Sequence, residues 1–330
     1  MPTPRFPRRQ FLPLLAGSLT LPLTQVALGN PKTLRPLKIG IIADLHQDII
    51  HDAPNRLSAF VQWAKEEQCS AIIQLGDFCI PKPDNRHLLD IWNSFPGPGL
   101  HVLGNHDMDG GFSREHTVQY LGLPHRHYTF DLNGWKCIVL DANDTPPNHP
   151  GGYPSYIAND QKEWLRQQLT ASNLPTLIFS HQSLAHPACI KNQQEIRNIL
   201  ATAQSPDGKR KVAACFNGHW HIDHSQWIDS IPYTHINSAS YYWMGDAYAK
   251  KRFAPAIHAQ RPSLERVAPY ADPLFALLQY SPSTNELILS GRTTTWIGPS
   301  PSDSGLDPAS HQCQPEWITP EIRNRSLPAT

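Results

Sequence analysis

From residue 37 onward, short continuous apolar runs alternate with segments in which apolar residues recur at helical spacing. Residues 37–43 form an almost continuous apolar run, which is typical of a buried strand. Leu57, Phe60, Val61 and Ala64 then recur at the i, i+3, i+4, i+7 spacing of an amphipathic helix. The same pattern predicts a helix near 84–93 and strands at 71–75 and 100–103. This repeated order of strand and helix indicates a layered α/β domain.

The middle of the chain departs from this order at a hairpin. Asn133-Gly134 separates the apolar runs 128–132 and 135–140, and this dipeptide is a strong signal for a two-residue turn. We therefore expect antiparallel strands to join the sheet here. After a loop at 146–156, the pattern predicts helices at 159–169 and 193–203 and strands at 176–179, 212–216, 226–228, 233–236, 275–279 and 286–289.

The chain divides into three parts in this interpretation: an export signal at 1–29, one domain at 30–297 and a C-terminal tail at 298–330. Arg8-Arg9-Gln10-Phe11-Leu12 precedes an uncharged stretch that ends in small residues near Gly29, as in signals of the twin-arginine type. A cleaved signal predicts a periplasmic or extracellular protein, and an uncleaved anchor is the alternative. The tail is rich in Pro and Ser without periodicity, which predicts loose attachment.

The charge balance limits the partners of the protein. Lysine plus arginine equals aspartate plus glutamate at 28 each, so no net field attracts nucleic acid or an anionic membrane. No apolar segment after the signal approaches the length of a bilayer span. We therefore expect no stable membrane span in the mature chain and a small molecule as the partner.

Polar side chains with metal-binding atoms follow five of the predicted strands. Ligands in open α/β sheets gather beyond the carboxyl ends of the strands, so these side chains are expected to converge. A pair of divalent ions needs a shared carboxylate and mixed nitrogen and oxygen ligands. Asp77 is well placed to be shared, and Asn105 offers a neutral oxygen. The five motifs are Asp44-Leu45-His46, Gly76-Asp77, Gly104-Asn105-His106-Asp107, Ser180-His181 and Gly218-His219-Trp220-His221.

These motifs, in this order, resemble those of the calcineurin-like metallophosphoesterase family over about residues 37–240. The resemblance implies an α/β fold, a four-layer α/β/β/α sandwich of two mixed sheets with a dinuclear metal site at the strand ends. It implies two divalent or trivalent ions, with manganese, iron, zinc and nickel all open. The first ion would be bound by Asp44, His46, Asp77 and His221, and the second by Asp77, Asn105, His181 and His219.

The resemblance also implies a reaction, which is hydrolysis of a phosphomonoester or phosphodiester. A metal-bridging hydroxide would attack phosphorus, and His106, which binds no metal, would protonate the leaving group as general acid. Position 80 departs from two branches of the family. Purple acid phosphatases carry a metal-binding tyrosine there and protein serine/threonine phosphatases carry an aspartate that orients the catalytic histidine, whereas this chain has Ile80. The residue that orients His106 is therefore not evident.

Aromatic residues lie downstream of several motifs. Tyr153 and Tyr156 occur in one loop, and Tyr241-Tyr242-Trp243 forms a second cluster. Such residues either wall a pocket that stacks on a flat leaving group or pack in the core.

Two other functions compete with the hydrolase. One is a non-catalytic metal-binding scaffold of the same fold, which would have no need of the unligated His106. The other is a structural metal binder, but structural sites are usually closed and rich in thiolate. The sequence therefore favours the enzyme.

Overall fold

The computed structural model describes residues 34–329. The expected export signal at residues 1–29 lies outside the described part. Within residues 34–329, no helix has the length and apolar character that crossing a membrane requires.

One six-stranded sheet contains the first predicted strands. Its order is β14-β13-β12-β1-β2-β3. The three strands β1, β2 and β3 are parallel to one another, and β12 runs antiparallel to β1. The strands are β1 (Leu37–Ile42), β2 (Ala71–Gln74), β3 (Gly99–His101), β12 (Ala276–Ser281), β13 (Glu286–Ser290) and β14 (Arg325–Pro328).

A second six-stranded sheet has the order β4-β5-β6-β7-β9-β8. The predicted hairpin is confirmed, because β4 and β5 pair antiparallel across Asn133-Gly134, and both turn residues have the positive φ of a type I′ turn. The strands β5, β6, β7 and β9 are parallel. The strands are β4 (Tyr128–Leu132), β5 (Trp135–Val139), β6 (Thr176–Phe179), β7 (Val212–Asn217), β8 (His224–Ile228) and β9 (Ile231–His235).

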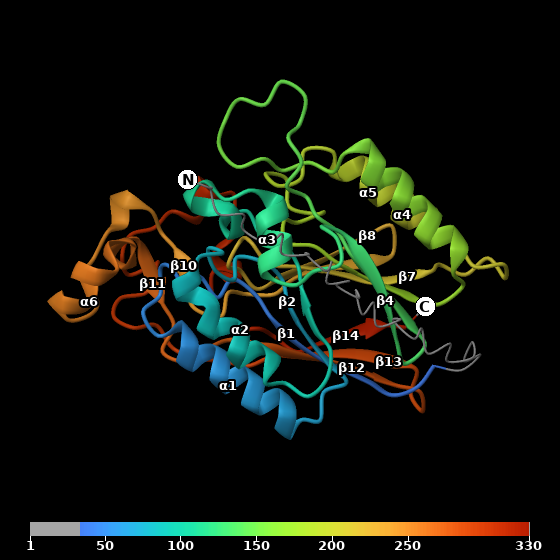
Figure 1. Cartoon of the computed structure of the whole chain (residues 1–330), viewed down its shortest axis with the longest axis horizontal. Coiled ribbons are helices and arrows are strands. Elements are labelled where there is room, and N and C mark those ends of the chain that lie inside the picture. The colour runs from blue at the N-terminus through green and yellow to red at the C-terminus, as the bar shows by residue number, and fades with distance from the viewer. Residues whose placement is uncertain (1–33, 330) are drawn as a thin grey trace, which may run out of the picture. The chain divides into compact units, whose positions relative to one another are not determined.

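The two sheets face each other across one apolar core. Ile39 and Ile41 of the first sheet belong to the same buried cluster as Phe179 and Phe216 of the second. Helices cover both outer faces, and Figure 1 shows them on opposite sides of the strands. The four-layer α/β/β/α sandwich of two mixed sheets is therefore confirmed. The covering helices are α1 (Ala53–Glu66) and α2 (Arg86–Asn93) on the first sheet, and α4 (Asn159–Ala171) and α5 (Gln193–Ala201) on the second.

Short elements complete the chain between the large ones. β10 (Tyr241–Trp243) pairs antiparallel with β11 (Val267–Pro269) in a separate two-stranded sheet. The helices α3 (Arg114–Tyr120) and α6 (Pro255–Gln260) have seven and six residues. The sequence pattern did not predict these elements, because they are too short to show a full period.

The expectation of a loosely attached C-terminal tail is wrong. β14 pairs with β13, and the side chains of Ile322 and Leu327 are buried in the core between the sheets. Leu306 and Cys313 are buried in a further apolar cluster. The error has a physical reason. These anchors are single apolar residues separated by polar residues and prolines, so each packs through long-range contacts that leave no periodic pattern.

Replacing a buried anchor of this segment is expected to destabilise the whole domain. Leu327→Ala removes a side chain that is only 2% exposed, and such core truncations cost about 2–5 kcal/mol. The control is Ile288→Ala on the adjacent strand, whose side chain is 37% exposed and whose loss is expected to cost less than about 1 kcal/mol. Urea unfolding measures both. Equal, small effects would contradict the attachment of the segment.

Candidate metal centre

All five motifs lie in loops at the carboxyl ends of parallel strands. The motif loops after β1 and β2 are joined by backbone hydrogen bonds, from the N–H of Asp44 to the carbonyl of Gly76 and from the N–H of His46 to the carbonyl of Asp77. The other loops follow β3, β6 and β7. The loops that follow strands of both sheets therefore lie at one edge of the sandwich. The predicted convergence of the five motifs is confirmed.

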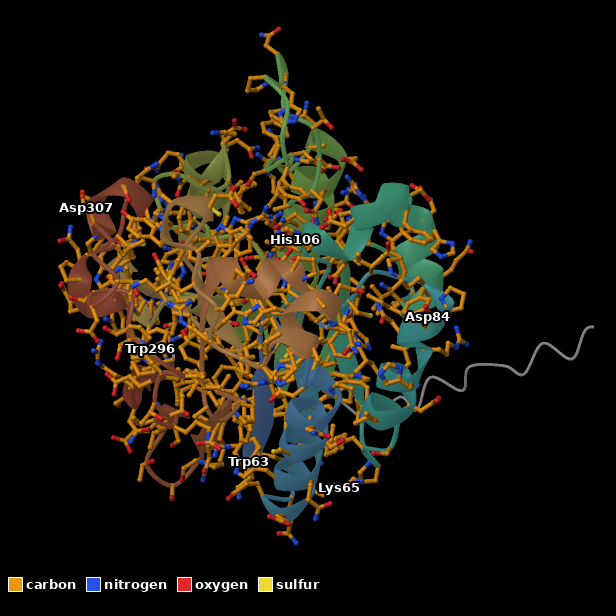
Figure 2. The ribbon with its side chains drawn as sticks, turned by 90° about the vertical axis from the view of Figure 1, so that its left-hand side faces the viewer. Trp63, Lys65, Asp84, His106, Trp296 and Asp307 are labelled. Atoms are coloured by element: carbon orange, nitrogen blue, oxygen red, sulfur yellow. The ribbon has the colours of Figure 1, made fainter. Side chains whose placement is uncertain are left out.

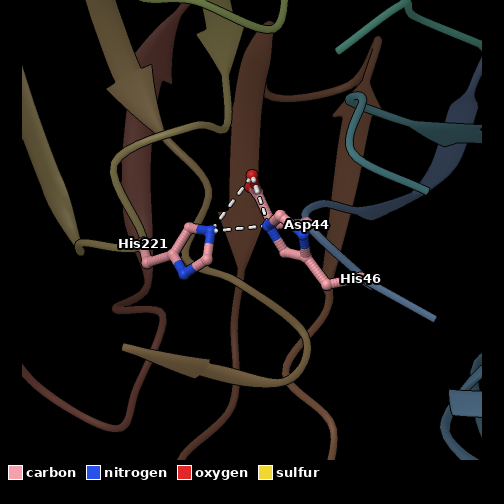
Figure 3. Close-up of side chains that lie close together, drawn as sticks. All are labelled: Asp44, His46 and His221. Atoms are coloured by element: carbon pink, nitrogen blue, oxygen red, sulfur yellow. Dashed lines mark hydrogen bonds and ion pairs between the residues drawn. The ribbon is translucent and has the colours of Figure 1, made fainter. Parts of the chain in front are cut away.

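A first cluster consists of Asp44, His46 and His221, whose ligand atoms all lie within 4.8 Å of one another. The Nε2 atoms of His46 and His221 are 3.1 Å apart, and His221 Nε2 is 3.3 Å from Asp44 Oδ1 (Figure 3). All three side chains are buried.

A second cluster consists of Asp77, His181 and His219, and its ligand atoms also lie within 4.8 Å of one another. His181 Nε2 is at its centre, 3.2 Å from Asp77 Oδ2 and 3.1 Å from His219 Nδ1. The amide oxygen of Asn105 is 3.1 Å from the same nitrogen. The sequence-predicted Asn105 is thus brought to this cluster as well.

Asp77 lies between the two clusters. Its Oδ2 is 3.2 Å from His181 Nε2 in the second cluster and 3.6 Å from His46 Nε2 in the first. Its Oδ1 accepts a hydrogen bond of 2.8 Å from the backbone N–H of His106. One oxygen is therefore held by the loop, and the other is directed at both clusters.

Backbone carbonyls set the orientation of two of these histidines. His181 Nδ1 is 2.7 Å from the carbonyl oxygen of Leu75, and His221 Nδ1 is 2.8 Å from that of Tyr241. A carbonyl oxygen can only accept, so each Nδ1 carries the proton it donates. In the neutral ring the Nε2 lone pair then points to the cluster, which is the tautomer and the second contact that metal-binding histidines commonly have.

The donor set fits divalent ions. The atoms that meet here are carboxylate oxygens, an amide oxygen and imidazole nitrogens, which are the ligand types that divalent transition-metal ions accept. Burial lowers the pKa of His219 to about 3, which keeps it neutral as a ligand. Burial also opposes protonation of His181, but the charges of Asp77 and Asp44 and the hydrogen bonds to Asp77 and the Leu75 carbonyl together raise its pKa to about 9.

The backbone at the clusters is held in an uncommon conformation. Five of the six cluster residues have the positive φ of the left-handed region, which is sparsely populated by residues other than glycine and costs about 1–3 kcal/mol each. Close approach of the loops is also required. A Cβ atom at Gly104 would overlap Asp77, and one at Gly218 would overlap the carboxylate of Asp44. The five residues are Asp44, His46, Asp77, His219 and His221.

Asp107 braces the loops that carry Asp77 and Asn105. Its buried carboxylate accepts hydrogen bonds from the backbone N–H groups of Asp77, Phe78, Cys79 and Gly104 at 2.7–3.1 Å. Burial and then the charge of Asp77 raise the pKa of Asp107 to about 7. The aspartate of the Gly-Asn-His-Asp motif is therefore structural, because its carboxylate oxygens accept hydrogen bonds from the backbone of both loops.

His106 lies outside both clusters and beside them. Its ring centroid is 5.3 Å from that of His46, and its side chain is partly exposed. Figure 2 labels it in the central part of the view, between the segment with Asp84 and the C-terminal segment with Asp307.

Asp109 is the residue that orients His106. His106 Nδ1 is 2.7 Å from Asp109 Oδ2, and the hydroxyl of Tyr153 donates to Asp109 Oδ1 at 2.7 Å while lying 3.0 Å from the same Nδ1. Burial opposes protonation, but the charges of Asp77 and Asp109 raise the pKa of His106 to about 8. Ile80 lines the small pocket beside this pair without contributing a charge. The feature of the sequence that could have identified Asp109 is its position three residues after His106, which is about one helical turn away.

A cavity of about 230 Å³ opens over the clusters, and both clusters and His106 line it. Trp220, Tyr242 and Trp243 line it as well. A larger groove of about 590 Å³ lies along α4 and α5, but no residue of the two clusters lines it. The smaller cavity is therefore the one that serves this centre.

The chain belongs to the calcineurin-like phosphoesterase family, whose model matches residues 37–223. No curated protein matches the sequence significantly. The family and the two clusters support a hydrolase with a candidate dinuclear metal site.

Solved structures share the fold. A dimetal phosphatase from Danio rerio superposes with a TM-score of 0.55 at 17% identity, over 79% of this chain and 98% of that one. GAP50 of Plasmodium, described as the anchor in the inner membrane complex, superposes with a TM-score of 0.52 at 12% identity, over 89% of each chain. At these identities the likeness shows the fold alone.

Removal of the Asp107 carboxylate is expected to destabilise the protein strongly. Asp107→Ala leaves four buried backbone N–H groups without an acceptor, and each such group costs about 1–3 kcal/mol. We expect a loss of more than about 3 kcal/mol in urea unfolding. The control is Asp109→Ala, since this carboxylate is 33% exposed and bonds only to side chains. A similar, small loss in both variants would contradict the role of Asp107.

Proposed function

We propose that the protein hydrolyses phosphoesters with a pair of metal ions shared by Asp77. The observation that carries this proposal is the position of Asp77 Oδ2, within 3.2–3.6 Å of a histidine nitrogen in each cluster. The ligands of the first ion would be Asp44, His46, Asp77 and His221, and those of the second Asp77, Asn105, His181 and His219.

Such a pair of ions, when bound, lowers the pKa of a water molecule and offsets the negative charge that develops on the phosphoryl oxygens. The nitrogen and oxygen ligands of the two clusters suit manganese, iron, zinc and nickel alike. The residues around the ions perform the other parts of the reaction.

His106 is the proposed general acid. It lines the cavity without belonging to either cluster, and the Asp109 carboxylate beside its Nδ1 favours the protonated ring. Asp109 engages Nδ1, so Nε2 is the ring nitrogen available for proton transfer to the leaving oxygen. A metal-binding scaffold without activity would gain nothing from this histidine or from the Asp109 and Tyr153 that hold it. The arrangement therefore favours the enzyme over the scaffold.

Loss of His106 is expected to spare metal binding and impair turnover. His106→Ala should keep two ions per chain, measured by elemental analysis after dialysis, and should lower kcat on alkyl phosphates about 100- to 10,000-fold. The loss on p-nitrophenyl phosphate should be much smaller, because nitrophenolate leaves without a proton.

Asp77→Asn is the variant for comparison with His106→Ala. Because it removes the carboxylate that both ions would share, it should lose metal, and it should lose activity on alkyl phosphates and on p-nitrophenyl phosphate alike. Turnover of neither mono- nor diesters by the wild-type chain with manganese, iron, zinc or nickel would favour the scaffold instead.

Asp109 is expected to act through His106. Asp109→Asn should retain two ions and reproduce the leaving-group pattern of His106→Ala with a smaller loss, below about 100-fold on alkyl phosphates. Tyr153→Phe should have a weaker effect, since the contact between His106 and Asp109 remains. The measurement is the ratio of kcat on phenyl phosphate to kcat on p-nitrophenyl phosphate. An unchanged ratio in Asp109→Asn would remove Asp109 from the reaction.

A further inference from the structure

The residues that line the cavity over the metal centre are of two chemical kinds. Cluster residues and His106 would act on the phosphate in the proposed reaction. Aromatic residues, among them Trp220, Tyr242 and Trp243, line the same cavity. This aromatic lining is suited to an organic group.

No lysine or arginine is found among the described residues that line this cavity. A substrate with a second phosphate or a carboxylate would need a cation or several donors to replace its lost hydration. The ions and His106 serve only the phosphate that reacts. The organic part of the substrate is therefore expected to be uncharged.

Trp243 presents an indole that the fold does not cover. Its side chain lies on β10 at the rim of the cavity and is 40% exposed, which few large apolar residues of this protein are. Trp220 is fixed from one side, because the ring of His186 stacks on it at a centroid distance of 3.9 Å. Two indoles, one of them backed by a second ring, thus border the same cavity.

His311 adds a polar group to the aromatic lining of the cavity. The Tyr242 hydroxyl is 2.8 Å from His311 Nδ1, which fixes the ring in place. No residue of the described chain forms a hydrogen bond with Nε2 of His311. Burial lowers the pKa of His311, which favours the neutral ring. This ring can therefore offer one hydrogen bond to a ligand without adding a charge.

The volume limits the size of the ligand. The cavity of about 230 Å³ is below the roughly 300–1,000 Å³ of pockets for drug-sized ligands. This space is sufficient for a group of the size of one or two fused rings.

Three residues of this lining lie outside the part of the chain that the family model matches. Tyr242, Trp243 and His311 all follow residue 223, where the match to the family ends, whereas Trp220 lies within it. Tyr242 and Trp243 come from β10, and His311 comes from the C-terminal segment. The family match therefore covers the two metal clusters and Trp220 but not these three residues.

We propose that this cavity is a leaving-group subsite for a flat, uncharged ring system carried by an ester with a single phosphate. The inference rests on the proposed function and names its substrate class. Aryl phosphates and nucleoside monophosphates share this chemistry, since both present a π-face to an indole. Stacking of this kind contributes about 5- to 100-fold in affinity for each ring.

The test compares Trp243→Ala with Trp227→Ala, which removes an equally large, 53% exposed indole from the edge strand β8. The substrates are 2-naphthyl phosphate, adenosine monophosphate, adenosine diphosphate and butyl phosphate. The wild type should have a lower KM for 2-naphthyl phosphate and adenosine monophosphate than for adenosine diphosphate and butyl phosphate. Trp243→Ala should raise KM for them about 5- to 100-fold, with little change for butyl phosphate and two ions still bound. Trp227→Ala should behave as the wild type, and the better of the two flat esters identifies the source of the ring.

Calorimetry on the metal-free protein separates this inference from the proposed function. Adenosine or 2-naphthol should bind the wild type and Trp227→Ala, and bind Trp243→Ala and His311→Ala at least about 5-fold more weakly. Binding without turnover of any ester would refute the hydrolase and keep the subsite. Turnover with no preference for flat esters, or an equal loss on butyl phosphate in Trp243→Ala, would overturn the subsite.

Discussion

The position of one carboxylate oxygen determines the rest of this site. Asp77 Oδ2 lies between a histidine of each cluster, so both clusters depend on where the loop after β2 ends. The loop is fixed from three directions, by the N–H of His106 on its other oxygen, by the brace of Asp107 and by the close approach of Gly104. The strained backbone at Asp77 persists because these contacts hold its loop in place.

Two different parts of the molecule form the metal centre and the cavity above it. The sandwich brings strand ends of both sheets to one edge, which concentrates nitrogen and oxygen ligands in a buried place. Segments outside the matched family region add Tyr242, Trp243 and His311 to the lining of the cavity. In the proposed reaction, the residues that act on the phosphate and most of those that contact the organic group therefore lie in different parts of the chain.

Much of the fold and of the centre was predictable from sequence, because the informative signals are local. Apolar runs end at Asp44, Asp77 and His181, and each such junction is visible within a few residues. Asp109 was missed although it is close in sequence, since its role depends on a short turn that has no pattern of its own. The contributions of Tyr153 and the C-terminal segment come from long-range contacts, which leave no periodic trace. Export through residues 1–29 stays a prediction from sequence.

The central claim, that two ions share Asp77, is tested most directly by the anomalous scattering of manganese in crystals of the protein. The account predicts two peaks about 3.5–4 Å apart, each about 2.2 Å from Asp77 Oδ2, with the peaks placed beside His46 and His181. A single peak, or two peaks of which only one lies within bonding distance of Asp77, would contradict it.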